Sequence, residues 1–130
     1  MRSLIYFVVF VGSFCCLSAV FAAESGPEQY FDIGNGYFNE EQYDKAITAY
    51  SKALELAPGH VLASYNRGLS YYKTGRNDLA IADYSMAVSN GYAKPDIFSS
   101  RGIAYLKTGQ YGLAAEDYTK VIAANPRFAE

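Results

Sequence analysis

The sequence predicts an all-α solenoid, a fold in which paired helices stack side by side. Three observations support this prediction. Several residue types recur every 34 positions, and each period contains two segments with the i, i+3, i+4, i+7 spacing of apolar residues that is typical of an amphipathic helix. In addition, no segment alternates between polar and apolar residues for long enough to form a strand. Units of this kind bury their apolar faces against neighbouring units.

Four invariant columns carry the 34-residue period. Each holds one residue type in three copies: Gly34, Gly68 and Gly102; Tyr37, Tyr71 and Tyr105; Ala46, Ala80 and Ala114; Tyr50, Tyr84 and Tyr118. The copies define units at 27–60, 61–94 and 95–128. We expect the Gly and Ala columns to let the two helices of a unit approach closely, because they remove side-chain bulk. The rings at 37, 71 and 105 are expected to fill the space beside them.

The sequence also predicts where helices begin and end. Asn39 is expected to cap the second helix of the first unit, with Gln42 as its capping-box partner. Gly75 is expected to end the first helix of the second unit, because glycine adopts the left-handed conformation of a helix C-terminus at little cost. Asn77 or Asp78 would then cap the helix that follows.

Residues 1–22 are predicted to be a secretory signal peptide. Arg2 precedes an apolar run over residues 4–21, and the small side chains of Val20 and Ala22 suit the −3 and −1 subsites of a signal peptidase. The alternative is an uncleaved membrane anchor, because ~17–25 apolar residues span a bilayer. In both cases the remainder is exported. We therefore expect a secreted or periplasmic protein, or one held at a membrane by residues 4–21.

Composition argues against several classes of function. The 130 residues include 11 Lys+Arg against 13 Asp+Glu, with no basic stretch, which argues against nucleic acid as a partner. Both cysteines, Cys15 and Cys16, lie in the leader. The one histidine, His60, is expected to be a solvated turn residue, and the acidic pairs Glu40-Glu41 and Glu116-Asp117 to lie on helix starts or outer faces. The sequence therefore predicts no metal, no cofactor and no enzyme activity.

The period, the helix pairing and these columns together resemble the tetratricopeptide repeat (TPR) family. The family pattern is an aromatic residue, Leu-Gly, Tyr, Ala, an aromatic residue, Ala and a closing Pro. The first unit meets it with Tyr30, Ile33-Gly34, Tyr37, Ala46, Tyr50, Ala53 and Pro58. The resemblance covers residues 27–128, with departures at Ser64 and Tyr92. It implies a right-handed superhelix whose concave face is built mainly from the first helix of each unit.

The resemblance also implies an apolar groove on that face, which holds a peptide or helix of another protein. Carried over residue by residue, the groove is lined by Phe31, Asn35 and Phe38; by Tyr65, Asn66, Leu69, Tyr72 and Lys73; and by Ile103, Leu106 and Lys107. Aromatic rings are frequent anchors of protein binding, because they give a large contact area for few frozen torsions. The function that the resemblance implies is an adaptor or assembly factor.

One subclass of the family grips the C-terminal carboxylate of chaperone tails with Asn and Lys or Arg side chains. Asn35 and Asn66 match two of those sites, but Phe31, Asp96 and Ser100 stand where a cation is needed. A carboxylate gains little without a cation to hold it. The sequence therefore disfavours binding of chaperone tails.

A different class of function stays open, namely a structural protein that assembles with copies of itself. After Pro126 the given sequence has only four residues, whereas a solenoid generally needs a polar cap over its last unit. The exposed end of the third unit is expected to include Leu113, Val121 and Ile122. A homo-oligomer is the partner that this alternative predicts.

Overall fold

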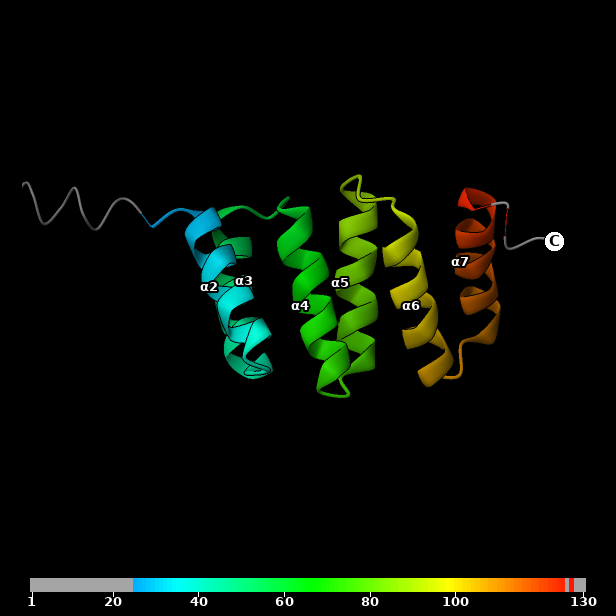
Figure 1. Ribbon diagram of the computed structural model, residues 1–130, viewed down its shortest axis with the longest axis horizontal. Coiled ribbons are helices and arrows are strands. Elements are labelled where there is room, and N and C mark those ends of the chain that lie inside the picture. The colour runs from blue at the N-terminus through cyan, green and yellow to red at the C-terminus, as the bar shows by residue number, and fades with distance from the viewer. Residues whose placement is uncertain (1–24, 126, 128–130) are drawn as a thin grey trace, which may run out of the picture.

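The computed structural model describes residues 25–125 and 127, and this part of the chain forms six α-helices and no strand (Figure 1). The helices are α2 (Pro27–Asn39), α3 (Tyr43–Leu56), α4 (Val61–Lys73), α5 (Asn77–Ser89), α6 (Pro95–Lys107) and α7 (Tyr111–Ala124). The predicted all-α solenoid is confirmed. The predicted leader, with its hydrophobic helix, lies outside the described residues. Each helix in the described part is too short or too polar to span a membrane.

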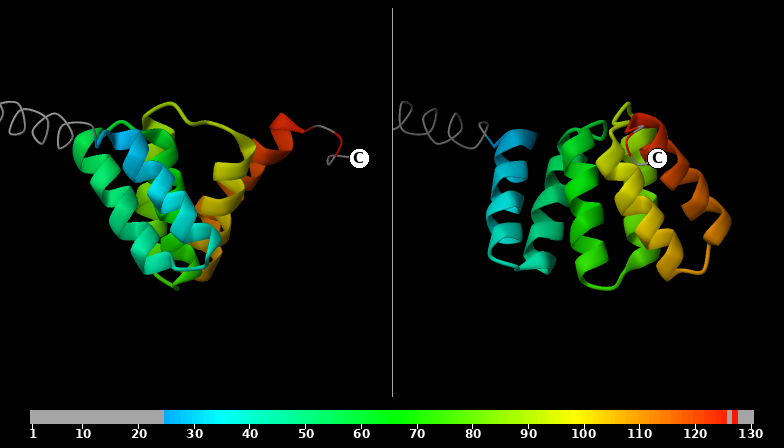
Figure 2. Two further views of the ribbon diagram at one scale, coloured as in Figure 1. Left: turned by 60° about the vertical axis from the view of Figure 1, so that its left-hand side comes forward. Right: turned by 45° about the vertical axis from the view of Figure 1, so that its right-hand side comes forward.

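The helices stack in chain order as three antiparallel pairs (Figures 1 and 2). Within the pairs, α2 packs on α3, α4 on α5, and α6 on α7; neighbouring pairs are joined by α3 against α4 and by α5 against α6. In addition, α4 contacts α2 and α6, whereas α3, α5 and α7 do not contact one another in the described part. The layer of α2, α4 and α6 is therefore the more closely spaced side of the stack, and we call it the inner face.

A glycine on the first helix of each pair faces a tyrosine ring on the second. A Cβ atom built on Gly34 would lie 2.5 Å from Cδ1 of Tyr50, and one built on Gly68 would lie 2.7 Å from Cε1 of Tyr84. Both rings are fully buried. The glycine column therefore lets the two helices approach until a ring of the second lies against the backbone of the first, as the sequence predicts for small residues at these positions.

The other tyrosine column, at Tyr37, Tyr71 and Tyr105, was predicted to fill the space beside the small residues. Tyr71 packs against the core cluster that contains Ala80, and Tyr105 is buried, while the rings nearest to the glycines are those of the Tyr50 column. The guanidinium of Arg67 lies 5.9 Å from the ring centroid of Tyr71, and that of Arg101 lies 5.7 Å from the centroid of Tyr105. These rings therefore support cations through cation–π attraction.

The predictions for the helix ends are partly confirmed. Gly75 has φ of +78°, a conformation that costs little for glycine, and it follows α4 as predicted. The predicted caps are wrong, because Asn39 is the last residue of α2 and Asn77 is the first residue of α5. Gln42 and Arg76 precede the following helices and make no side-chain cap hydrogen bond. Backbone hydrogen bonds close these short turns instead.

Two tyrosines at equivalent positions are expected to respond differently to loss of their hydroxyl groups. The Tyr84 hydroxyl is buried without a hydrogen-bond partner among the described residues, so Tyr84→Phe should leave stability unchanged or raise it by up to ~1 kcal/mol. The Tyr50 hydroxyl donates to Oδ1 of Asn35 at 2.8 Å, so Tyr50→Phe should lower the free energy of unfolding by about 1 kcal/mol. Urea denaturation measures both, and equal losses would contradict this prediction.

Candidate functional site

Hydrogen bonds connect the three helices of the inner face. Oδ1 of Asn35 accepts both from the Tyr50 hydroxyl and from Nδ2 of Asn66, the latter at 2.9 Å, which joins α2 to α4. The hydroxyl oxygens of Tyr65 and Ser100 lie 3.4 Å apart and join α4 to α6. Asn35 and Asn66 were both predicted to lie in the groove, and the structure brings them into direct contact. Their bonds hold the inner helices in register.

The predicted ring residues are half-buried in the seams between helices. The ring centroid of Phe31 lies 4.8 Å from that of His60, and the centroid of Tyr65 lies 5.3 Å from that of Tyr92. Phe38 packs in the same way against Tyr43, and Leu69 and Tyr72 pack against the core cluster of the second and third pairs. These side chains therefore contribute to stability and leave only part of their surface for a ligand.

The exposed members of the predicted site lie on α4 and α6. Ile103 and Leu106 are exposed apolar side chains of α6, and Lys73 and Lys107 are exposed in the last turns of α4 and α6. Exposed aliphatic side chains can be buried by a ligand without disturbing the core. Ile103 and Leu106 are therefore the residues through which this face can gain binding energy at the least cost to folding.

The inner face carries charges of both signs at its two edges. Its three helices run in the same direction, because each is followed by an antiparallel partner. Glu28 and Asp96 lie exposed in the first turns of α2 and α6, while Lys73 and Lys107 lie in the last turns of α4 and α6. This distribution favours the helix dipoles. Glu40 and Glu41 follow α2 at the same edge as the two lysines, and Lys94 precedes α6 at the edge of Glu28 and Asp96, so a ligand meets mixed charge on both sides.

Burial strengthens the preference of the phenol groups near this face for the protonated form. It raises the pKa of Tyr50 and of Tyr92 to about 12, and it also raises the pKa of Tyr65. A phenol loses hydration when buried, and this disfavours the charged form. At neutral pH these groups therefore remain neutral, and they offer hydrogen bonds and apolar ring surface.

His60 has a different role from the one expected. It was predicted to be a solvated turn residue, but its side chain is largely buried against Phe31 and it precedes α4 as the N-cap. Its Nδ1 accepts a hydrogen bond from the N–H of Ala63 at 3.2 Å. The contact with Phe31 of α2 buries the ring. Among the described residues, no group of three or more His, Cys, Asp or Glu side chains is placed to hold a metal ion.

An ion-pair clamp, which was not predicted from the sequence, joins neighbouring helix pairs. Nε and Nη2 of Arg67 donate to the two carboxylate oxygens of Asp83, each at 2.7 Å, and Nη1 donates to Oγ of Ser51 on the preceding helix at 3.0 Å. The bond to Asp83 raises the pKa of the Arg67 guanidinium. The clamp therefore ties both helices of the second pair to α3.

The clamp is repeated one period later, with distances of 2.7–3.1 Å among Arg101, Asp117 and Ser85. Asp117 was expected on an outer face, but it is buried because it pairs with Arg101. A sequence signal for the clamp existed, since its Arg, Asp and Ser positions each recur after 34 residues.

Paired helices stacked in this way define a helical-repeat protein. Two tetratricopeptide repeat models match the chain, one at residues 31–96 and the other at residues 95–128. The chain belongs to the tetratricopeptide repeat family. No curated protein sequence matches it.

Solved structures show the same fold. The first TPR of Spaghetti (RPAP3), bound to the HSP90 peptide SRMEEVD, is 27% identical with a TM-score of 0.73; the match covers 77% of this chain and 79% of that chain. The second TPR domain of human RPAP3, in complex with the HSP70 peptide SGPTIEEVD, is 28% identical with a TM-score of 0.71 and covers 78% and 88%. MamA is 27% identical with a TM-score of 0.74 and covers 81% and 61%.

Proposed function

We propose that this protein is an exported protein-interaction module that binds a peptide or helix of a partner protein on its inner face. It acts as an adaptor or assembly factor, without enzyme activity, metal or cofactor. The exposed pair Ile103 and Leu106 on α6, together with the half-buried rings of Tyr65 and Tyr72 on α4, carries this proposal. Apolar side chains of this kind are typical anchors of peptide recognition. The peptides bound by the RPAP3 domains support the same mode of binding.

The preferred ligand is an apolar segment rather than an acidic chaperone tail. Both peptides bound by the RPAP3 domains end in Glu-Glu-Val-Asp. In this chain, Phe31, Asp96 and Ser100 occupy positions where family members that bind such tails have cations. Arg67 and Arg101 are on inner-face helices, but their guanidinium groups are committed to the clamps. An acidic tail would therefore find no cation at those three positions, although Lys73 and Lys107 are exposed in the last turns of α4 and α6.

The organisation that we propose places three repeats behind a leader. The repeats are residues 27–60, 61–94 and 95–128, and each contains one of the three helix pairs. Residues 1–22 act as a signal peptide or, if uncleaved, as a membrane anchor through residues 4–21. The apolar run behind Arg2 supports this assignment, and a periplasmic or secreted location follows from it.

Replacing both Ile103 and Leu106 with Ser is expected to weaken partner binding about tenfold, because full burial of such a side chain contributes roughly 1.5–3 kcal/mol and the two side chains are still 37% and 45% exposed. Crosslinking in the native envelope identifies the partner, and titration with the purified partner measures affinity. The free energy of unfolding should fall by about 1–2 kcal/mol, because Ser is the weaker helix former and part of each side chain is already buried, and circular dichroism checks that the fold is retained. Tyr65→Ala would be a poorer test, because that ring packs against the core.

The matched control is Leu79→Ser on α5. Leu79 is 47% exposed, close to the 45% of Leu106, but it lies outside the inner face. Its replacement should leave binding unchanged. If the partner bound the Ile103/Leu106 double variant as tightly as the unaltered protein, binding on the inner face would be refuted.

A further inference from the structure

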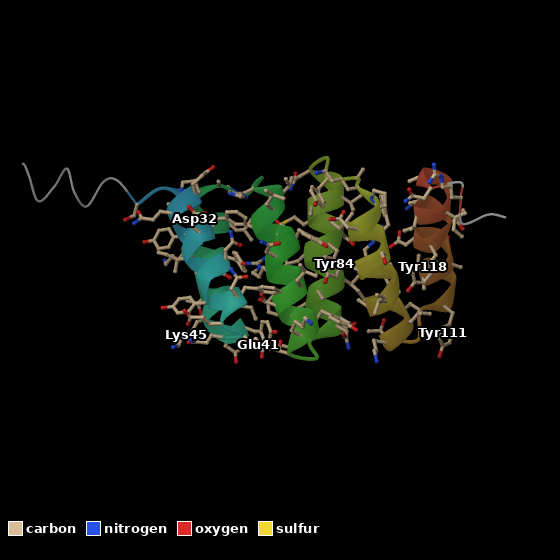
Figure 3. The ribbon with its side chains drawn as sticks, in the orientation of Figure 1. Asp32, Glu41, Lys45, Tyr84, Tyr111 and Tyr118 are labelled. Carbon is tan, nitrogen blue, oxygen red and sulfur yellow. The ribbon has the colours of Figure 1, made fainter. Side chains whose placement is uncertain are left out.

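The α2/α3 end of the stack carries an exposed apolar pocket of about 290 Å³. Tyr30, Ile33 and Tyr37 of α2 line it together with Ala49 of α3, and Lys45, Thr48 and Lys52 of α3 complete the lining. Figure 3 places Lys45 at this end of the stack. Ile33 is 42% exposed, which is unusual for an aliphatic side chain surrounded by rings. The pocket lies on a different surface from the inner face.

In the other two pairs, the equivalent surface is covered by the preceding helix. Arg67 and Asp83 lie one period after Ile33 and Ala49. In their clamp, Arg67 donates a hydrogen bond to Ser51 of α3. The first pair thus has a surface equivalent to the one that α4 and α5 present to α3. On this surface, two apolar residues stand in place of the ion pair. A helix seated on it would need no hydrogen-bonding group at the position of Ser51.

At the other end of the stack, α7 exposes the surface equivalent to the one with which α3 contacts α4. Leu54 of α3 is only 8% exposed because α4 covers it, whereas Ile122, two periods later on α7, is 45% exposed. Thr119 stands at the position of Ser51, and its hydroxyl donates to the carbonyl of Ala115 at 2.8 Å. Thr119 therefore needs no arginine partner and can present its methyl group to an apolar surface.

We propose that a second copy of this chain seats its α7 on the α2/α3 end, so that copies stack head to tail. The joint continues the interface that already connects α3 to α4 and α5 to α6. In the register of that interface, Thr119 of one copy meets Ile33 of the next, as Ser51 meets Arg67, and Ile122 lies at Gln29 of α2, one period before the Ala63 that clusters with Leu54. Such a contact is heterologous, because it joins two different surfaces. After each addition, one α2/α3 end and one α7 end remain free, so assembly continues as an open filament. The inner face stays free for a partner.

Sedimentation equilibrium of residues 23–130 tests this proposal. The described core residues all lie between Gly34 and Asp117, so this segment keeps the complete described core. The average mass should rise with concentration beyond that of two copies. Ile33→Asp and Ile122→Asp should each weaken association at least about tenfold, since each places a charge in an apolar joint. Ile33→Leu should retain assembly.

Mixing the two Asp variants gives the decisive result. Each keeps one intact end, so an equimolar mixture should form one-to-one dimers that do not grow further. Leu79→Asp, at an exposed site away from both ends, and the Ile103/Leu106 double Ser variant should assemble like the unaltered chain. The second of these controls separates this proposal from partner binding on the inner face.

Three outcomes would overturn the proposal. The first is a monomer at every concentration. The second is assembly of the unaltered chain without pairing of the mixed Asp variants, which would indicate a symmetric contact or another surface. The third is binding of a peptide of residues 1–22 at Ile33 in place of a second copy, which would assign the pocket to the leader.

Discussion

Arg67→Ala is expected to lower the free energy of unfolding by about 3–5 kcal/mol. The substitution leaves the Asp83 carboxylate buried without its cation and removes the hydrogen bond to Ser51 between helix pairs. A buried charge that loses its partner pays its desolvation cost without compensation, and this cost exceeds the value of an exposed ion pair several-fold. Urea denaturation followed by circular dichroism measures the change.

The matched control is Arg76→Ala. Arg76 also pairs with a carboxylate, that of Asp44, but both side chains are exposed, so the loss should be at most about 1 kcal/mol. Replacing Arg67 with Ile together with Asp83 with Ala copies the apolar pair Ile33 and Ala49. This double variant should be more stable than Arg67→Ala, because it leaves no buried charge. Equal losses of unfolding free energy for Arg67→Ala and Arg76→Ala would contradict the stabilising role of the clamp.

Gly68→Ala is expected to destabilise the fold by about 1–3 kcal/mol through overpacking. The new methyl group would lie 2.7 Å from Cε1 of Tyr84 and 3.3 Å from the carbonyl oxygen of Ala80. Tyr84 is fully buried and cannot move aside, so the two helices must separate. This cost outweighs the gain of up to ~1 kcal/mol that Ala brings to a helix.

Two other glycines calibrate this effect. A methyl group on Gly102 would lie 3.1 Å from Cζ of Tyr118, which is only half-buried, so Gly102→Ala should cost less than Gly68→Ala. A methyl group on Gly36 in α2 would have no neighbour within 4 Å, so Gly36→Ala should stabilise the protein by up to ~1 kcal/mol. Thermal denaturation measures the order of stability among the three variants. A loss of stability in Gly36→Ala as large as that in Gly68→Ala would refute the steric explanation.

The repeat columns predicted the helix pairs well but the cap residues poorly. Gly34, Gly68 and the tyrosines facing them recur because each pair repeats one close contact, and a contact of this kind leaves a mark at a fixed spacing. Asn39 and Asn77 have good cap chemistry, yet they lie inside helices. Local preferences of about 1 kcal/mol are overridden when packing sets the length of a turn.

The sequence predicted which residues form the candidate site, whereas the structure showed how far each of them is buried. Phe31, Tyr65 and Phe38 were expected to line an apolar groove, but their rings also pack in seams between helices. Exposure separates them from Ile103 and Leu106, and exposure depends on neighbours that are distant in the sequence. The clamp was missed for a related reason, because single Arg, Asp and Ser positions do not reveal that they meet.

By itself, the sequence determined the helical class, the 34-residue spacing and the small residues at the contact within each pair, because these depend on residues of one unit and their repetition. Only the tertiary structure decided which charges are buried, which rings remain accessible and which faces lie uncovered at the two ends. Those properties depend on contacts between units, where Arg67 meets Ser51 and where Ile33 meets no helix in the described part.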